Sequence, residues 1–321
     1  MSDPRTSLTP SSAFLLVVIF AAFGAQQTAV KLAVTDIGQI AQAALRSFGG
    51  AGLLAGWFLW RRSNPFAAPL ALSVLLGVLF AIDFGLLYLG IALTSASHAT
   101  VLYSTAPMMI AIAAMTAIAD EPFDTRKIAG IAIAFSGVAI VALVRPSGGS
   151  ATRVGDLLCL GAAAAWALTV LVVRATCLKT VDAPVVLFHQ LFWSVPLLAA
   201  TARVTGETVR FGPVAVGSLA FQTIAVAFVG YLIFFRLLQL HPASQVSAMS
   251  FLAPLFGVLS AWAILDEVPT PGFAAGAGAI LTGLYLTNRA PRTGRDPRRL
   301  PRDRPSAAAA PQKSPPPGAC R

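Results

Sequence analysis

The sequence predicts an all-α integral membrane protein with ten transmembrane helices, arranged as two inverted repeats of five helices each. Three observations predict this fold class: the scarcity of charge, the number of long apolar stretches, and an internal duplication. Of 321 residues, 56% are hydrophobic and 11% are charged, and the mean hydropathy is +0.76. Because a soluble domain carries roughly 25% charged residues, most of this chain's surface has to face lipid. Composition therefore excludes a soluble enzyme and an intrinsically disordered chain.

Ten apolar stretches are candidates for transmembrane helices, since about 20 apolar residues cross the ~30 Å hydrocarbon core as a helix. The first stretch continues past Gln26 and Gln27 to Lys31, so we expect a retained helix and not a cleaved signal peptide. Hydrocarbon offers no hydrogen bonds to an open backbone, so every span is expected to be helical. The expected helices are approximately 13–33, 40–60, 69–92, 97–118, 127–144, 155–175, 184–202, 214–238, 244–265 and 271–288.

The net charge of +10 is concentrated in the last 33 residues, where nine Lys or Arg accompany two Asp. This tail has no aromatic residue and is rich in Pro and Ala, so it reads as disordered, and no nucleic-acid partner is expected. Lys and Arg placement favours a multi-pass cell-membrane protein with both termini in the cytoplasm. The expected parts are a cytoplasmic N-terminus (1–12), a first repeat (13–145), a second repeat (154–288) and a basic tail (289–321).

An internal duplication divides the apolar body into two halves of five spans. An odd number of spans makes the two halves enter the membrane in opposite senses, and such inverted repeats are typical of secondary transporters. The substrate path of such proteins lies between the halves. The pairs that match at shifts of 147 or 146 residues are Ala96-Ser97 with Ala243-Ser244, Ala106-Pro107 with Ala253-Pro254, Asp120-Glu121 with Asp266-Glu267, Gly130 with Gly276, and Gly137 with Gly283.

These landmarks resemble those of EamA-type permeases of the drug/metabolite transporter superfamily. The resemblance rests on the stretch from Tyr88 to Ser97 followed by Pro107 and Asp120-Glu121, and on its repetition through Pro254 to Asp266-Glu267. Further matching positions are Lys31, Arg46, Gly155-Asp156 and Trp166. The resemblance implies two five-helix repeats, cytoplasmic termini and export of small metabolites or drugs.

Arg46 and Asp83 are the clearest charged residues inside predicted spans, where each charge costs at least ~2.5–3.5 kcal/mol. At 1.5 Å per residue, they lie about 9 Å and about 14 Å from the periplasmic ends of their helices. We expect them to face the bundle interior and to meet. They are either a substrate-binding or proton-linked pair, or a structural ion pair, or Arg46 extends to the headgroups.

Other polar residues and two prolines are weaker candidates for the translocation path. His189 matches Arg46 in the second half and titrates near neutral pH, although a hydrogen-bonded structural histidine is the simpler alternative. Gln27 and Gln222 can bind a zwitterion or join helices. Tyr88 and Tyr103 can close the pore, stack on a substrate or lie at the interface. His98 is expected at the interface, and Trp166 in packing.

Pro107 and Pro254 are expected to kink their helices, with either a gating or cavity role or a static packing role. The acidic pairs are expected to cap or end helices. Three histidines on separate helices, without a carboxylate at ligand spacing, predict no metal site, and no cofactor is expected.

The sequence thus predicts a secondary transporter that exports small organic solutes, such as amino acids, related metabolites or drugs, by alternating access. Its expected partners are a small-molecule substrate, membrane lipids and a proton or other coupling ion, and it is expected to be a monomer or homodimer. No nucleotide-binding motif supports direct use of ATP. The alternatives are a transporter of sugar-phosphates, nucleotide-sugars or lipid-linked solutes, and a membrane scaffold or receptor without flux. The sequence shows no catalytic groups that converge near one membrane face, so it does not support the alternative of a membrane enzyme.

Overall fold

The helices of the computed structural model follow the apolar stretches of the sequence. The structure describes residues 9–117, 125–144, 152–241, 246, 249–250 and 252–288. These residues form helices and no strand, with an isolated bridge between Ile37 and Val209, so the all-α class is confirmed. The elements are α1 (Pro10–Ala33), α2 (Gln39–Arg61), α3 (Leu70–Leu93), α4 (Ala96–Tyr103), α5 (Ala106–Ala117), α6 (Thr125–Leu143), α7 (Arg153–Ala175), η1 (Cys177–Thr180), α8 (Ala183–Val204), α9 (Pro213–Ala220), the π-helix η2 (Phe221–Gly230), α10 (Tyr231–Leu240), α12 (Leu252–Leu265) and α13 (Pro271–Asn288).

Within the described part of the chain, five helical segments are long and apolar enough to cross a membrane: α1, α3, α7, α8 and the continuous segment 213–237. Shorter apolar helices occupy 128–141, 252–265 and 271–286. These segments coincide with predicted spans, while the count of ten remains a prediction. Residues 1–8, the Asp120-Glu121 pair and the basic tail 289–321 lie outside the described residues.

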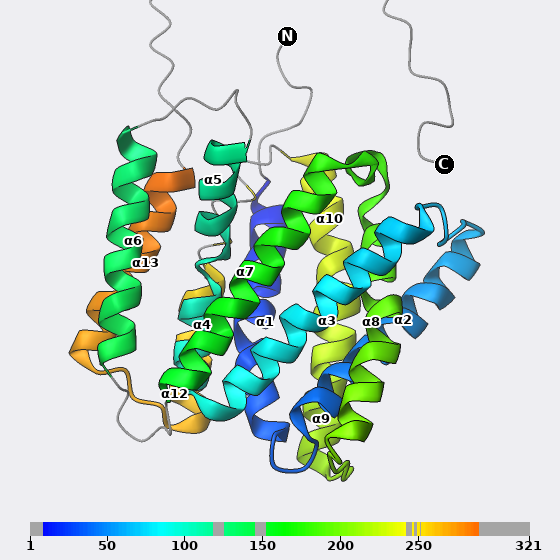
Figure 1. The fold of residues 1–321 in the computed structure, drawn as a ribbon, viewed down its shortest axis with the longest axis horizontal. Helices are drawn as coiled ribbons and strands as arrows, with labels where there is room; N and C mark the ends of the chain where they lie inside the picture. The colour runs from blue at the N-terminus through cyan, green and yellow to red at the C-terminus, as the bar shows by residue number, and fades with distance from the viewer. Residues whose placement is uncertain are drawn as a thin grey trace, which may run out of the picture.

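The connections between helices lie at two opposite ends of the bundle (Figure 1). We call the end with residues 34–38, 94–95, 205–212 and 266–270 the lower face, as it appears in the figure. Residues 62–69 and 176–182 lie at the opposite, upper face. Helix α1 begins and α13 ends at the upper face, so the body starts and finishes on one side.

Helices α6 and α13 pack closely through glycines and run antiparallel. A Cβ atom added to Gly137 would lie 2.6 Å from the carbonyl oxygen of Gly276, and one added to Gly283 would meet the carbonyl oxygen of Gly130. The sequence duplication matches Gly130 with Gly276 and Gly137 with Gly283. This contact is therefore unchanged when the two halves are exchanged, as expected for inverted repeats.

The first helix of each half crosses over to pack against the other half. Helix α1 packs on α12, and α7 packs on α4 and α5, while α2 packs on α8. In Figure 1, α6 and α13 lie together at one side of the bundle and α2 and α8 at the other, with α1, α4, α5 and α7 between them. Because α1 packs against the second half and α7 against the first, the interface between the two halves lies at the centre of the bundle.

We predict that Gly283→Ala destabilises the protein by about 1–3 kcal/mol, the usual cost of overpacking. The new methyl group would lie 2.7 Å from the backbone nitrogen of Ala134, which cannot move without shifting α6. Gly278→Ala in the same helix is the matched control, because a Cβ atom there meets nothing within 4 Å. Thermal unfolding of both purified variants measures the difference, and equal melting temperatures would contradict the close α6–α13 contact.

Candidate functional site

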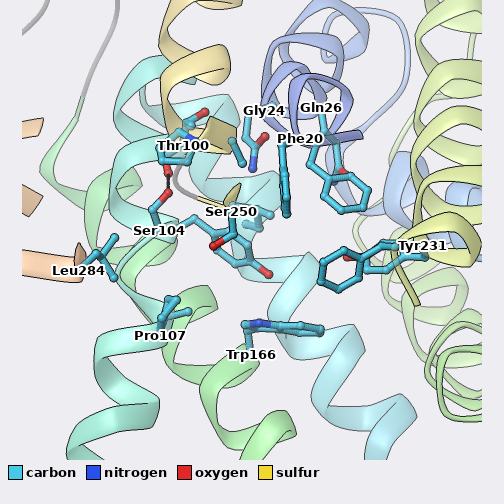
Figure 2. Close-up of a pocket in the computed structure, with 18 of the residues that line it drawn as sticks. Phe20, Gly24, Gln26, Thr100, Ser104, Pro107, Trp166, Tyr231, Ser250 and Leu284 are labelled. Atoms are coloured by element: carbon cyan, nitrogen blue, oxygen red, sulfur yellow. Dashed lines mark hydrogen bonds between the residues drawn. The ribbon is translucent and has the colours of Figure 1, made fainter. Parts of the chain in front are cut away.

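A cavity of about 350 Å³ lies between the two halves of the bundle. Its walls come from α1, α3, α4, α5, α7, α10, α12 and α13, and Figure 2 shows side chains pointing into it from all sides. The volume lies at the small end of the roughly 300–1,000 Å³ typical of small-molecule sites.

The starts of two helices, α5 and α12, meet the cavity at corresponding points of the two halves. Helix α4 ends at Tyr103 and α5 starts at Ala106, and Ser104, Ala106 and Pro107 line the cavity. In the second half α12 starts at Leu252, and Pro254 lines the cavity.

The prediction that Pro107 kinks a continuous helix is wrong in detail, because α4 ends at Tyr103 and α5 starts at Ala106. Both Pro107 and Pro254 lie in the first turn of a helix, α5 and α12. Proline is well tolerated there because its missing N–H would have no partner in the helix. Both prolines nevertheless line the cavity, as their matched positions in the two halves suggested.

Aromatic rings form much of the cavity wall. Phe23 of α1 and Tyr231 of α10 have ring centroids 5.0 Å apart, and Phe20 and Phe234 extend this contact with centroids 5.9 Å apart. Trp166 of α7 faces the cavity from another side (Figure 2). The sequence assigned Trp166 to packing, because periodicity does not show which face of an apolar helix meets a cavity.

The two neighbouring amides of α1, Gln26 and Gln27, both line the cavity but differ in their partners. The side-chain nitrogen of Gln27, oriented toward its own helix, donates to the carbonyl oxygens of Phe23 at 3.3 Å and Gly24 at 3.1 Å. Gln26 makes no side-chain hydrogen bond to any part of the chain that the structure describes, and only 7% of it is exposed. The free amide therefore belongs to Gln26, not to the singled-out Gln27.

Arg46 and Asp83 are buried beside the cavity, each behind a residue of its wall. Arg46 is 1% exposed and its guanidinium carbon lies 4.2 Å from the ring centroid of Phe84. Asp83 is 0% exposed, and its Oδ2 accepts a hydrogen bond of 3.2 Å from the Tyr103 hydroxyl. Both Phe84 and Tyr103 line the cavity.

The prediction that these two side chains meet is wrong. Within the described part of the chain, Arg46 and Asp83 form no ion pair, because no nitrogen of Arg46 lies within 4.0 Å of an oxygen of Asp83. Nε and Nη1 of Arg46 and Oδ1 of Asp83 have no hydrogen-bond partner in the described part of the chain. Depth along a helix, which the sequence supplied, does not determine rotation about the helix axis.

Tyr88 and Gln222 belong to a buried polar chain that joins helices and does not line the cavity. The Tyr88 hydroxyl donates to Oε1 of Gln222 at 2.5 Å, and Nε2 of Gln222 donates to Oε1 of Gln42 at 2.8 Å and to Oγ of Ser218 at 3.0 Å. The chain connects α3, η2, α2 and α9. Satisfied buried networks of this kind position helices, which is the joining alternative given for Gln222, whereas for Tyr88 this role was not among the expected ones.

Within the described part of the chain, His189 makes no hydrogen bond or ring contact with the cavity residues or with the polar chain of Tyr88 and Gln222. It is 2% exposed near the start of α8, with its ring 5.7 Å from that of Phe66 and 5.6 Å from that of Phe188. It does not line the cavity, so the correspondence with Arg46 in the duplicated sequence does not extend to a shared site.

A second group of polar residues closes the lower face. Lys31 of α1 donates to the carbonyl oxygens of Ile91 at 2.7 Å and Thr94 at 2.5 Å, at the end of α3. Asp156 of α7 accepts from the Thr94 hydroxyl at 2.6 Å and contacts Nδ1 of His98 at 3.1 Å. His98 is therefore buried, at 0% exposure, and the prediction that it lies at the interface is wrong.

Glu267 completes this closure by capping α4. Its carboxylate accepts hydrogen bonds from the backbone N–H groups of Ala96 and Ser97, both at 2.9 Å, and from the Ser97 hydroxyl. The capping role expected for this acidic pair is confirmed for Glu267. On α1, α4 and α7 the residues of this group lie nearer the lower face than the cavity residues do, so their contacts lie between the cavity and that face.

Comparison with known proteins identifies related chains along most of this sequence. The model of the EamA-like transporter family matches residues 10–143 and again residues 153–289. An uncharacterized transporter, YvbV of Bacillus subtilis, is 29% identical over 169 residues, which span 52% of this chain and 55% of that protein. A probable amino-acid metabolite efflux pump of Salmonella typhimurium is 25% identical over 287 residues, covering 85% of this chain and 93% of that one.

The fold is also similar to one already solved. A chain of known crystal structure superposes with a TM-score of 0.63 at 16% identity, covering 87% of this chain and 96% of that chain. At this identity the similarity concerns the fold alone.

Proposed function

Because the chain belongs to the EamA-like transporter family, we propose that it is a secondary transporter that exports small organic solutes by alternating access. The observation that carries the proposal is the cavity between the two halves, lined by residues at the start of α5 in the first half and of α12 in the second. Transporters with inverted repeats bind substrate at such an interface, near discontinuous helices. The name of the Salmonella relative, a probable amino-acid metabolite efflux pump, supports amino-acid metabolites as first candidates.

In this proposal the lower face is periplasmic, as Lys and Arg placement predicts, and the structure is a state closed to the periplasm. Lys31, Asp156 and Glu267 hold that end shut through the ends of α3 and α4. Release of the substrate requires these contacts to break while the two halves rock against each other.

The alternative substrates with phosphate groups receive less support. None of the described residues that line the cavity carries a charged side chain. A phosphate group taken from water without a cationic partner would pay a large desolvation cost. Neutral or zwitterionic solutes fit this lining better.

Counterflow in proteoliposomes tests the proposal with a panel of amino acids and their neutral derivatives. We expect saturable exchange of at least one solute above the level of protein-free liposomes. Ser104→Trp should stop this exchange, because Ser104 lines the cavity. Ser136→Trp is the matched control: both serines donate to the carbonyl oxygen four residues earlier, at 2.7 Å and 2.8 Å, but Ser136 is exposed on α6. Absence of exchange for every solute, or exchange equal in both variants, would contradict the proposal.

A further inference from the structure

The cavity combines an aromatic enclosure with one uncommitted amide. Seven of its lining residues are aromatic, from both halves of the chain, and α1 and α10 supply a wall of rings in mutual contact. Trp166 stands apart from this wall: its indole has no ring partner and no hydrogen bond in the part of the chain that the structure describes. Figure 2 shows Trp166 and Tyr231 on different sides of the cavity.

In this arrangement the indole ring of Trp166 makes no aromatic contact within the described part of the chain. Aromatic rings prefer offset or edge-to-face contacts with centroids about 4.5–7 Å apart. The Phe23–Tyr231 wall has already reached this spacing, whereas Trp166 has not. An aromatic ring of a bound solute could make such a contact with Trp166 and, on its other side, pack against the Phe23–Tyr231 wall.

The polar groups of the cavity restrict the charge of the solute. The amide of Gln26 offers two donors and an acceptor with no commitment elsewhere in the described chain. Arg46 and Asp83 contact Phe84 and Tyr103 of the cavity wall but do not themselves line the cavity. A solute with net charge would therefore be buried without an opposite charge in contact, whereas a polar group of a net-neutral solute finds a partner in Gln26.

We propose that the cavity binds net-neutral solutes that carry an aromatic ring, with the ring between Trp166 and the Phe23–Tyr231 wall and the polar end at Gln26. This inference rests on the proposed function, because it assigns the substrate class of the same cavity. It goes further in stating that aliphatic solutes of equal charge, and aromatic anions, bind less well.

Three probes separate the ring from the charge: tryptophan is net-neutral and aromatic, leucine is net-neutral and aliphatic, and indole-3-lactate is aromatic and anionic. Binding to the purified protein is measured by thermal stabilisation, and transport by counterflow in proteoliposomes. We expect tryptophan to bind at least about tenfold more tightly than either other probe. Equal binding of tryptophan and leucine would overturn the role of the ring, and tighter binding of indole-3-lactate would overturn the charge rule.

Variants test the named residues. Trp166→Leu should weaken tryptophan binding about tenfold and leave leucine unchanged, and Gln26→Leu should weaken both. Trp262→Leu is the matched control, since Trp262 is 50% exposed on α12 and outside the cavity. Unchanged tryptophan binding by a folded Trp166→Leu variant would overturn the assignment, and Trp166→Phe should restore part of the affinity.

The outcomes distinguish this inference from the proposed function. If leucine exchanges across the membrane and tryptophan neither binds nor exchanges, export stands and the aromatic substrate class is wrong. If tryptophan binds tightly and no solute exchanges, the aromatic site stands and the transport proposal is wrong. If none of the three probes binds, the substrate class is wrong.

Discussion

Replacing Asp83 by asparagine is expected to lower proton-gradient-driven transport at least tenfold while the protein remains folded and still exchanges substrate by counterflow. Asp83 is a fully buried carboxyl whose hydrogen-bond partner, Tyr103, lines the cavity. A proton gained or lost at Asp83 thus changes the hydrogen bond of a residue that lines the cavity. The charge of Arg46 on α2 also acts on Asp83.

The stability of the same variant separates this role from a structural ion pair. Removing one partner of a buried ion pair costs about 3–5 kcal/mol. Because Arg46 does not contact Asp83, we expect Asp83→Asn to change the free energy of unfolding by less than ~1 kcal/mol. A larger loss would indicate a structural pair.

The control variants are Asp182→Asn and Tyr103→Phe. Asp182 is an exposed residue before α8, and its replacement should change neither transport nor stability. Tyr103→Phe removes only the hydroxyl that donates to Asp83, and it should weaken gradient-driven transport in the same direction. Full gradient-driven activity of Asp83→Asn would remove Asp83 from the coupling mechanism.

Glu267→Ala is expected to give the largest loss of stability, about 3 kcal/mol or more. Its carboxylate accepts from three donors at the start of α4, and Glu267 is 4% exposed. Each buried donor left without a partner costs about 1–3 kcal/mol. Loss of this carboxylate would also release the start of α4 at the lower face.

Thermal unfolding of purified variants measures this effect, with two comparisons. Glu267→Gln retains one acceptor oxygen and should lose less than the alanine variant. Asp266→Gly changes the neighbouring acidic residue, whose φ is 55°, so it should be neutral or stabilising. A melting temperature of Glu267→Ala equal to that of the unchanged protein would show that the cap does not hold α4.

Much of the fold could be predicted because its causes are local in the chain. Long apolar stretches must form helices in lipid, and the matched glycines and prolines of the two halves identified the duplication. The same reasoning located Pro107, Pro254 and Tyr103, all of which line the cavity, and the capping role of Glu267.

The contacts of the site could not be predicted in the same way. Gln26 and Gln27 are neighbours with the same chemistry, and about 100° of rotation on a helix decides which amide is free. Trp166 occupies a helix that is apolar all round, so no pattern showed that it faces the cavity. Arg46 and Asp83 were recognised as buried charges but joined to each other, whereas the structure gives them Phe84 and Tyr103.

The sequence by itself determined that the chain is a membrane protein, that it is helical, and that it contains one repeated unit twice. These properties follow from composition and from regularities along the chain. Only the tertiary structure decided which side chains surround the cavity, that α4 and α5 are separate helices, and which polar residues join helices at the lower face. Those features depend on the rotation and crossing of helices, which packing against distant segments determines.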